Sequence, residues 1–404
     1  MLIPRVFFLF AYWHEPGWKG FVGATVKIRD LAVNLSAMGH EVVLFVPRCG
    51  IDKSGFDFEV VEIPVIDLPG LRMLSFNLFL ALRLFSGGFA VRPGVVYLRR
   101  TTSIVPILYA RLVHALFFFE VNDDPYYGAG RKKIPFTARL RNFLSVKMDE
   151  VNIRSADRVF VISRDIMEKI GNNLAGLERE SLVLMASGAN TDLFSPGDHE
   201  RARARCGLDP GREYVCFMGS LLAHQGVGAL IHAAPLILKV RPGCRFLVIG
   251  EGPMRGEWEA EVAALGLCEN FIFTGQIPYD QAPDRIRAAD LCVAPYLPDA
   301  GLRSPVKIFD YLACGKPVVA SDVPGTTGIF KGLDAVVPVT PGDPAMLARA
   351  IVSLLENRKL RMRMGAAGRA WVCANFSRRM MAGMVARTAK SLAYGKTRGG
   401  KGAV

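Results

Sequence analysis

The chain has 404 residues, enough for two domains of ordinary size that each bury a core. Its 51% hydrophobic content excludes a disordered protein. The eight cysteines include no C-x-x-C pair, so they indicate neither a disulfide framework nor a zinc site and favour a reducing cytoplasm. No run of about 18 uncharged apolar residues occurs, so no transmembrane helix is expected. The apolar amino terminus lacks a small-residue cleavage site and is expected to be a buried strand.

The chain has a formal charge of +13, and two of its stretches contain basic residues without any acidic ones. Residues 68–119 contain six arginines and no acid, and residues 377–404 contain seven lysines or arginines and no acid. Cations interleaved with leucine and phenylalanine indicate contact with an anionic membrane surface. Nucleic acid is the rival partner of a basic protein, but no nucleic-acid module is recognisable and none is expected to bind. A merely solvated basic surface is left open.

The first strand is predicted at residues 6–11, followed by a loop with glycines at 17, 20 and 23, a helix and a strand at 42–46. In α/β proteins ligands bind at the carboxyl ends of strands, and glycine lets the backbone approach a ligand closely. His14, Gly20 and Gly23 are therefore candidate binding residues.

Two further parallel strands are predicted at residues 95–99 and 116–121, and the second ends in Asn122 and Asp123. Paired acids at a strand end can hold a metal ion. The spacing of Asp123 and Asp124 does not fit a D-x-D metal site, however, so no metal is expected here.

Proline, glycine and charges cluster at residues 195–198 and predict a domain boundary there. The expected organisation is a Rossmann-like domain over 1–195, a second over 196–376, and a basic region over 377–404. In that last region an amphipathic helix is predicted from Arg378 to Tyr394, followed by a disordered tail.

The second domain is predicted to begin with a strand at 214–218, a glycine turn from Gly219 and a helix at 227–240. Further on, Gly250, Gly252 and Gly256 follow a strand and open a helix, close to a dinucleotide-binding fingerprint. Their G-x-G-x-x-x-G spacing departs from that fingerprint, so a dehydrogenase is a weakly favoured alternative.

The stretch from Ala294 to Gly325 predicts a helix that begins at Ser304-Pro305 and stops at Gly315. Its first turn carries cations, and free N–H groups and cations at a helix start make an anion site. One acid follows a turn later. This arrangement suits a nucleoside diphosphate with its ribose, although an ordinary capped helix is the open alternative.

The segment SPVKIFDYLACGKPVVASDVPG (304–325) resembles the donor-site motif of family-4 retaining glycosyltransferases, in their SP-x-K variant. GHEVVLF, ADRVFVIS, FMGSLLAHQGVGALIHA, VIGEGPMRGEWEAEVAALGL, FTGQIP and AADLCVAPY follow the order of that family, so the resemblance extends from about residue 17 to 376. It implies the GT-B fold, in which two Rossmann-like domains face each other across a cleft, the first binding the acceptor and the second the nucleotide sugar.

The resemblance also implies residue roles. Lys307 and Arg303 would neutralise the diphosphate, Asp310 would bind the ribose, and Ser304 would cap the helix and contact a phosphate through its backbone. Further donor-binding residues would be Pro305, Gly219, Ser220, Gln225, Gly250, Glu251, Gly252, Gly275 and Ile277. Residues on the acceptor side would be His14, Gly20, Gly23, Asn122 and Asp123. Neither a cofactor nor a bound metal is expected.

Five positions depart from the family pattern. Asn122 stands where many relatives have histidine, and Ser220 and Gln225 stand where arginine and lysine usually grip the diphosphate. Leu302 replaces the first acid of the E-x7-E motif, and Asp310 replaces the second. The missing acid normally touches the donor sugar, so the identity of that sugar stays open.

The sequence thus predicts a retaining glycosyltransferase that works against the inner face of the membrane. It would transfer sugar to a glycan or lipid-linked acceptor in the synthesis of cell-surface polysaccharide or glycolipid. The alternatives are a non-catalytic membrane-associated protein that binds nucleotide sugar, and a GT-B nucleotide-sugar epimerase.

Overall fold

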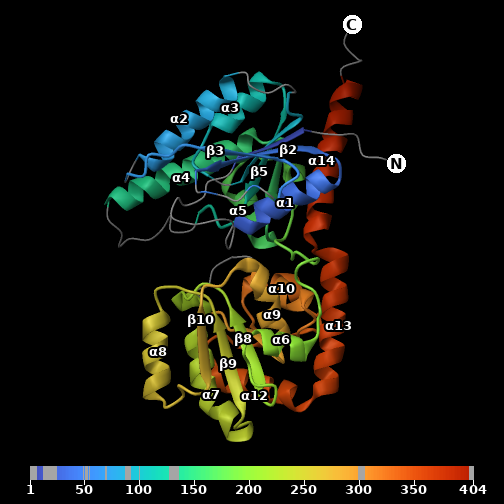
Figure 1. Ribbon diagram of the computed structural model, residues 1–404. Helices are drawn as coiled ribbons and strands as arrows, with labels where there is room; N and C mark the ends of the chain where they lie inside the picture. Colours follow the sequence, from blue (N-terminus) through green and yellow to red (C-terminus); the bar gives the residue numbers. More distant parts are fainter. Residues whose placement is uncertain are drawn as a thin grey trace. The chain divides into compact units, whose positions relative to one another are not determined.

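The contacts of the chain divide it into two compact units. The computed structural model describes residues 7–11, 25–48, 50, 53, 55–68, 71–86, 92–99, 101–126, 136–298 and 305–399. Unit 1 comprises Met1–Ala186 and Arg378–Val404, and unit 2 comprises Ser187–Ser377 (Figure 1). Each unit is built on one parallel sheet covered by helices, which confirms the predicted α/β class.

Unit 1 contains a seven-stranded parallel sheet with the order β3-β2-β1-β4-β5-β6-β7. The strands are β1 (Phe7–Ala11), β2 (Glu41–Pro47), β3 (Glu59–Ile63), β4 (Val95–Arg99), β5 (Leu116–Val121), β6 (Arg158–Val161) and β7 (Leu182–Leu184). In β1, which lies between β2 and β4, Phe8 is in register with Val42 on one side and Val95 on the other. Such strands read as continuous apolar runs because helices cover both faces of the sheet.

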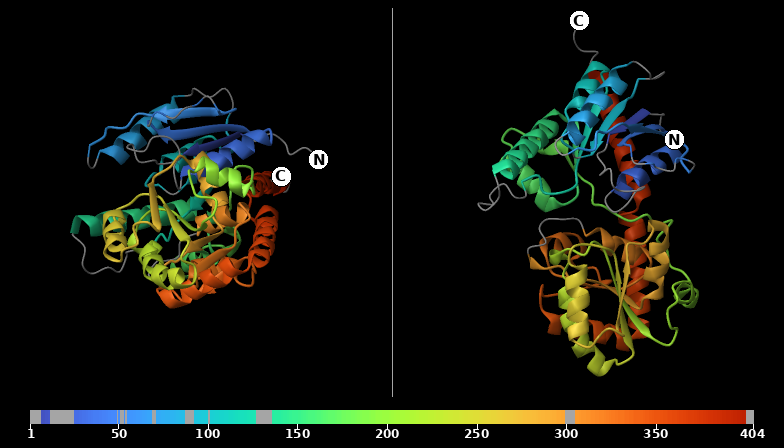
Figure 2. Two further views of the ribbon diagram at one scale, coloured as in Figure 1. Left: turned by 60° about the horizontal axis from the view of Figure 1, so that its bottom comes forward. Right: turned by 60° about the vertical axis from the view of Figure 1, so that its left-hand side comes forward.

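The helices of unit 1 form a layer on each face of this sheet. They are α1 (Thr25–Ala37), α2 (Arg72–Phe85), α3 (Val105–Leu112), α4 (Phe136–Ser155), α5 (Arg164–Asn173) and α14 (Arg378–Gly399). A short 3-10 turn, η1 (Arg179–Ser181), precedes β7. Helices α1 and α14 lie side by side on one face, whereas α2, α3 and α4 lie on the other (Figures 1 and 2).

The carboxyl-terminal helix belongs to unit 1. The contacts place the boundary between the units after residue 186 and return the chain to unit 1 at Arg378, whereas the sequence suggested a boundary after residue 195 and a separate region from 377. Helix α14 also continues to Gly399, so the prediction of a tail after Tyr394 was wrong for residues 395–399; residues 400–404 lie outside the described residues. The apolar face of the helix, as far as Leu392, packs on α1 and joins the core of unit 1.

A cluster of charged side chains is buried beneath α1. Lys27 of α1 forms an ion pair at 2.7 Å with Glu120 of β5, and Arg99 of β4 lies 3.7 Å from the same carboxylate oxygen. The hydroxyl of Tyr97 donates a hydrogen bond of 2.7 Å to the other oxygen. Burial alone would raise the pKa of Glu120, but Lys27 and Arg99 outweigh it and lower the pKa to about 2. Glu120 is therefore the anion that allows two cations to stay in the core.

Unit 2 contains a six-stranded parallel sheet with the order β10-β9-β8-β11-β12-β13. The strands are β8 (Glu213–Met218), β9 (Cys244–Ile249), β10 (Phe271–Gly275), β11 (Leu291–Ala294), β12 (Val318–Ser321) and β13 (Val336–Val339). The chain runs outward from β8 to β10 and then returns to the other side of β8. Neighbouring strands β8 and β11 thus send their connections in opposite directions, and such a switch point is where open α/β sheets bind ligands.

Helices cover both faces of this second sheet as well. They are α6 (His199–Arg205), α7 (Val227–Val240), α8 (Arg255–Ala264), α9 (Ala282–Ala288), α10 (Val306–Ala313), α11 (Pro324–Phe330), α12 (Pro344–Glu356) and α13 (Arg358–Asn375), with 3-10 turns η2 (Ala223–Gln225) and η3 (Tyr279–Gln281). Helices α7, α8 and α12 supply the core on one face, while α6 packs on α9 and α10 packs on α13 (Figure 1).

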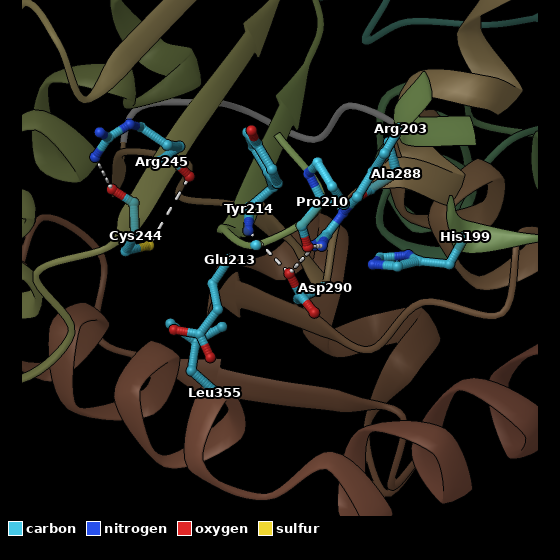
Figure 3. A network of polar contacts seen from close by, with 12 residues as sticks. His199, Arg203, Pro210, Glu213, Tyr214, Cys244, Arg245, Ala288, Asp290 and Leu355 are labelled. Carbon is cyan, nitrogen blue, oxygen red and sulfur yellow. Dashed lines mark hydrogen bonds and ion pairs between the residues drawn. The ribbon is translucent and has the colours of Figure 1, made fainter. Parts of the chain in front are cut away.

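A polar network closes the amino-terminal edge of the unit 2 sheet (Figure 3). Asp290, just before β11, accepts hydrogen bonds from the backbone N–H of Tyr214 at 2.9 Å and from Arg203 of α6 at 2.8 Å. Arg203 also donates to the carbonyl oxygens of Ala288 and Pro210. The network holds α6 and α9 to the edge opposite the carboxyl ends of the strands, so its role is structural.

We predict that Glu120→Ala destabilises the protein by about 3–5 kcal/mol, because it leaves Lys27 and Arg99 buried without their anion. Urea unfolding followed by circular dichroism measures the effect. Glu59→Ala, at an exposed strand position, is the matched control and should stay within about 0.5 kcal/mol of the wild type. Equal losses in the two variants would contradict the proposed role of Glu120.

Candidate functional site

Three turns meet at the carboxyl ends of β8, β9 and β10. The N–H of Gly219, directly after β8, donates to the carbonyl of Ile249 at 2.9 Å, and the N–H of Gly250 donates to the carbonyl of Gly275 at 3.0 Å. Two residues after Gly219, the N–H of Leu221 donates to the carbonyl of Glu251 at 2.9 Å. Predicted donor-site glycines from three separate segments thus lie together along one sheet edge.

The backbone is packed too tightly at these turns for side chains. A Cβ on Gly250, whose φ is +136°, would lie 2.0 Å from the carbonyl oxygen of Gly219. A Cβ on Gly252 would lie 2.6 Å from the carbonyl oxygen of Leu221, and one on Gly219 would lie 2.7 Å from Lys307 Nζ. The turns at this edge therefore carry no side chains, which lets a ligand approach the backbone closely.

The third glycine of the dinucleotide-like pattern behaves differently. Gly256 lies in the first turn of α8, and a Cβ there would meet nothing within 4 Å. In a dinucleotide fingerprint the third glycine allows close packing of helix on strand. Gly256 meets no such constraint, so the geometry disfavours the dehydrogenase interpretation.

Helix α10 brings Lys307 to this edge. The helix begins at Val306 with Pro305, which is buried, as its N-cap, one residue later than the sequence suggested. It ends as predicted, with Gly315 at φ +72° just after its C-cap. Arg303 and Ser304, the other predicted phosphate contacts, lie outside the described residues.

The ammonium group of Lys307 is buried against aromatic rings. Its Nζ lies 3.9 Å from the ring centroid of Phe217 and 5.2 Å from that of Tyr296, and it donates a hydrogen bond of 2.6 Å to Gln225 Oε1. The residue is only 8% exposed, and burial lowers the pKa of Lys307 to about 7. Because its hydrogen-bond partner is a neutral amide, the site favours an anion beside this cation.

Three aromatic residues of this site were missed by sequence reasoning. Phe217 and Tyr296 surround the Lys307 ammonium, and the hydroxyl of Tyr311 accepts a hydrogen bond of 2.6 Å from the backbone N–H of Met218. Phe217 and Tyr311 lie in apolar runs that read as core. The one available signal was Tyr296, which follows a strand at its carboxyl end.

The other predicted donor residues lie nearby in the chain, and their roles stay predictions. Asp310 follows Lys307 by one helical turn and is 4% exposed. The carboxylate of Glu251 pairs with Arg255 at 2.6 Å, which lowers the pKa of Glu251. Ser220 is exposed and Ile277 is half-buried.

On the predicted acceptor side, Asn122 and Asp123 follow β5. The Asp123 carboxylate accepts a hydrogen bond of 2.9 Å from the N–H of Asp124, whose own carboxylate pairs with Lys169 at 2.5 Å. His14, Gly20 and Gly23 lie outside the described residues. Within the described ranges, no group of three or more histidine, cysteine or acidic side chains is placed to hold a metal ion. None of the helices in those ranges is long and apolar enough to cross a membrane.

Two family models match parts of the chain that overlap at residues 198–209. Residues 198–371 match glycosyl transferases group 1, and residues 22–209 match the glycosyl transferase 4-like domain. The two models together cover residues 22–371, and each of the two parallel-sheet units carries one of them. The chain thus has the two domains of a group 1 glycosyl transferase.

Two curated relatives each match about half of the chain. A 2-deoxystreptamine glucosyltransferase of Streptomyces kanamyceticus is 29% identical over 191 residues, which are 47% of this chain and 49% of that protein. A D-inositol 3-phosphate glycosyltransferase of Acidothermus cellulolyticus is 33% identical over 194 residues, which are 46% of this chain and 42% of that protein. The match therefore spans about half the length of these relatives.

Solved structures share the whole fold. Sucrose-phosphate synthase from Thermosynechococcus elongatus has a TM-score of 0.74 at 20% identity, covering 97% of this chain and all of that one (100%). Anabaena HepE in complex with UDP and glucose has a TM-score of 0.73 at 18% identity, covering 96% of this chain and 100% of its own. These likenesses confirm the GT-B fold.

We predict that Gly250→Ala lowers the melting temperature by several degrees, because its Cβ would collide with the Gly219 carbonyl and its φ disfavours a side chain. Gly256→Ala is the matched control and should gain up to about 1 kcal/mol, since it lies in a helix with open space around it. Calorimetry of both variants checks this. A loss of stability in Gly256→Ala would contradict this interpretation, because it would indicate the close helix–strand packing of a dinucleotide fingerprint.

Proposed function

We propose that the protein transfers a sugar from a nucleoside-diphosphate sugar to a glycan or lipid-linked acceptor, with retention of the anomeric configuration. The observation that carries the proposal is the buried Lys307 ammonium beside the bare Gly219 turn. A cation and backbone N–H groups at a helix start together suit a diphosphate. HepE, which shares the fold, was solved with UDP and with UDP-glucose, and this supports the choice of donor class.

Lys307 would act on the leaving group. When the bond between the sugar C1 and the diphosphate oxygen breaks, negative charge develops on that oxygen, and a preorganised cation in a site of low dielectric constant stabilises it. In a front-face reaction the acceptor hydroxyl oxygen bonds to C1 on the same side, and its proton passes to the leaving phosphate. The protein then needs no nucleophile and no metal ion.

The remaining roles follow from the sequence resemblance. Arg303 would share the diphosphate charge with Lys307, and Ser304 would contact a phosphate through its backbone. Asp310 would accept hydrogen bonds from the ribose hydroxyls, and Asn122 would contribute on the acceptor side. Ser220 and Gln225 are neutral where the family has cations. The cations of α10 would therefore neutralise more of the diphosphate charge.

The acceptor and location are proposed from charge. Arginines interleaved with leucine and phenylalanine in residues 68–119 favour a cytoplasmic protein held against an anionic membrane face. A lipid-linked precursor of a cell-surface polysaccharide or glycolipid would then be available in the same membrane.

The first test is a thermal-shift screen of nucleoside diphosphates and their sugars. A ligand that stabilises the wild type should lose about 10- to 100-fold in affinity with Lys307→Ala, the value of one charge-assisted contact. Lys239→Ala, an exposed lysine of α7, is the matched control and should bind like the wild type. Asp310→Asn tests the ribose contact in the same screen.

Catalytic activity is tested by measuring the release of sugar from the nucleoside-diphosphate sugar that binds. Binding without any release of sugar would overturn the enzymatic proposal in favour of a non-catalytic nucleotide-sugar-binding protein. Absence of binding to every nucleotide would overturn the assignment of the donor site to Lys307.

Donor affinity should fall as the pH rises above about 7. Burial lowers the pKa of free Lys307 to about 7, and the diphosphate binds the protonated form, so each pH unit above that value should cost up to about tenfold in affinity. Titration calorimetry with UDP-glucose between pH 6 and pH 9 measures the slope. Lys307→Met should bind more weakly and show a flat profile; a steep profile in this variant would assign the titration to another group.

A further inference from the structure

Helix α2 is apolar on two opposite faces. Its inward side chains, which pack on the sheet of unit 1, are Phe76, Leu80 and Leu84. Two positions before each of them, and therefore about 200° around the helix, stand Leu74, Leu78 and Leu82, which are 66%, 58% and 59% exposed. A helix covered on one side normally presents polar residues on the other, so this outer face is suited to a contact.

Helix α3 extends this outer face. Leu108 and Leu112 are 53% and 63% exposed, one helical turn apart. The two helices are packed together, since the ring of Phe85 meets that of Tyr109 edge-on at 5.7 Å. They cover the same face of the sheet (Figure 1). We call the surface formed by Leu74, Leu78, Leu82, Leu108 and Leu112 the α2–α3 face.

The charges within the two helices are all positive. Arg72 and Arg83 lie in α2 and Arg111 lies in α3, and neither helix contains an acid. Leucines next to arginines match the acyl boundary and the phosphates of an anionic lipid surface. A two-fold contact with a second copy would instead bring arginines together without an acid from either helix to pair with them, which disfavours self-association.

The second basic stretch of the chain does not offer such a face. In α14 the apolar side chains Met381, Val385 and Ala389 are buried against α1, at 5%, 0% and 1% exposure. Its exposed positions include Arg379 and Arg387. The two basic stretches, residues 68–119 and 377–404, look alike in sequence but differ in the structure. Of the two, only residues 68–119 have exposed leucines that can insert into a membrane.

We propose that the α2–α3 face docks the protein on an anionic phospholipid bilayer, with its leucines inserted at the headgroup boundary and Arg83 and Arg111 on lipid phosphates. The docking surface deepens the proposed function, because it would hold the protein on the membrane that contains a lipid-linked acceptor. Only the identity of that acceptor rests on the proposed function. Docking itself requires neither donor nor transfer.

The test is flotation of the full chain with vesicles of phosphatidylcholine alone or mixed with phosphatidylglycerol. The wild type should bind the mixed vesicles and lose binding in high salt. Combined Leu74→Gln, Leu78→Gln and Leu82→Gln should lower partitioning by on the order of a hundredfold or more, because the inserted methylene groups are removed. Arg83→Gln and Arg111→Gln should each lower it about fivefold on the mixed vesicles only.

Matched controls come from unit 2. Leu236→Gln with Val240→Gln and Leu265→Gln removes three exposed apolar residues, and Arg358→Gln with Arg363→Gln removes two exposed arginines; both variants should bind like the wild type. Unchanged melting temperature and nucleotide binding in the leucine variant show that it is folded and that the donor site is intact, which separates this inference from the proposed function.

Wild-type binding that survives the α2 substitutions would overturn the proposal, as would a wild type that ignores both vesicle types while still binding nucleotide. A wild-type dimer that the α2 substitutions convert to a monomer, without vesicle binding, would also overturn it by showing that a second copy covers this face.

Discussion

The burial of the Lys307 ammonium group depends on the packing of several turns in unit 2. Lys307 can lie against the ring of Phe217 only because Gly219 has no side chain, and Gly219 can lie where it does only because Gly250 leaves room for its carbonyl. The cation has a neutral amide as its hydrogen-bond partner and a pKa of about 7. A buried cation held in this way is a site prepared for an anion, and its desolvation is offset when a phosphate arrives.

The two edges of the unit 2 sheet differ in the side chains that they carry. At the amino edge, Asp290 and Arg203 satisfy one another and the neighbouring backbone groups, and the charges are fully engaged. At the carboxyl edge, glycine turns keep side chains away. Parallel strands place all their carboxyl ends on one edge, so the fold itself makes this separation possible.

Unit 1 shows how tertiary packing changes the meaning of a sequence pattern. Residues 68–119 and 377–404 are both basic and apolar, and both suggest a membrane contact. Packing on α1 covers the apolar face of α14, whereas α2 keeps Leu74, Leu78 and Leu82 exposed. Amphipathic character is a local property, but whether an apolar face is covered depends on distant segments.

The sequence by itself determined most of the parallel strands, the limits of α7, the end of α10 at Gly315 and the group 1 family, because apolar runs, helix signals and short motifs are read directly along the chain. It also predicted a shared site for Lys307 and the glycines, and the structure brings Lys307 next to Gly219. Only the tertiary structure decided that Phe217 and Tyr296 enclose the ammonium and that Gln225, 82 positions away, accepts its hydrogen bond. It also decided that Gly256 is unconstrained. These contacts join different βα units, and their geometry follows from the order of strands in the sheet, which no local pattern encodes.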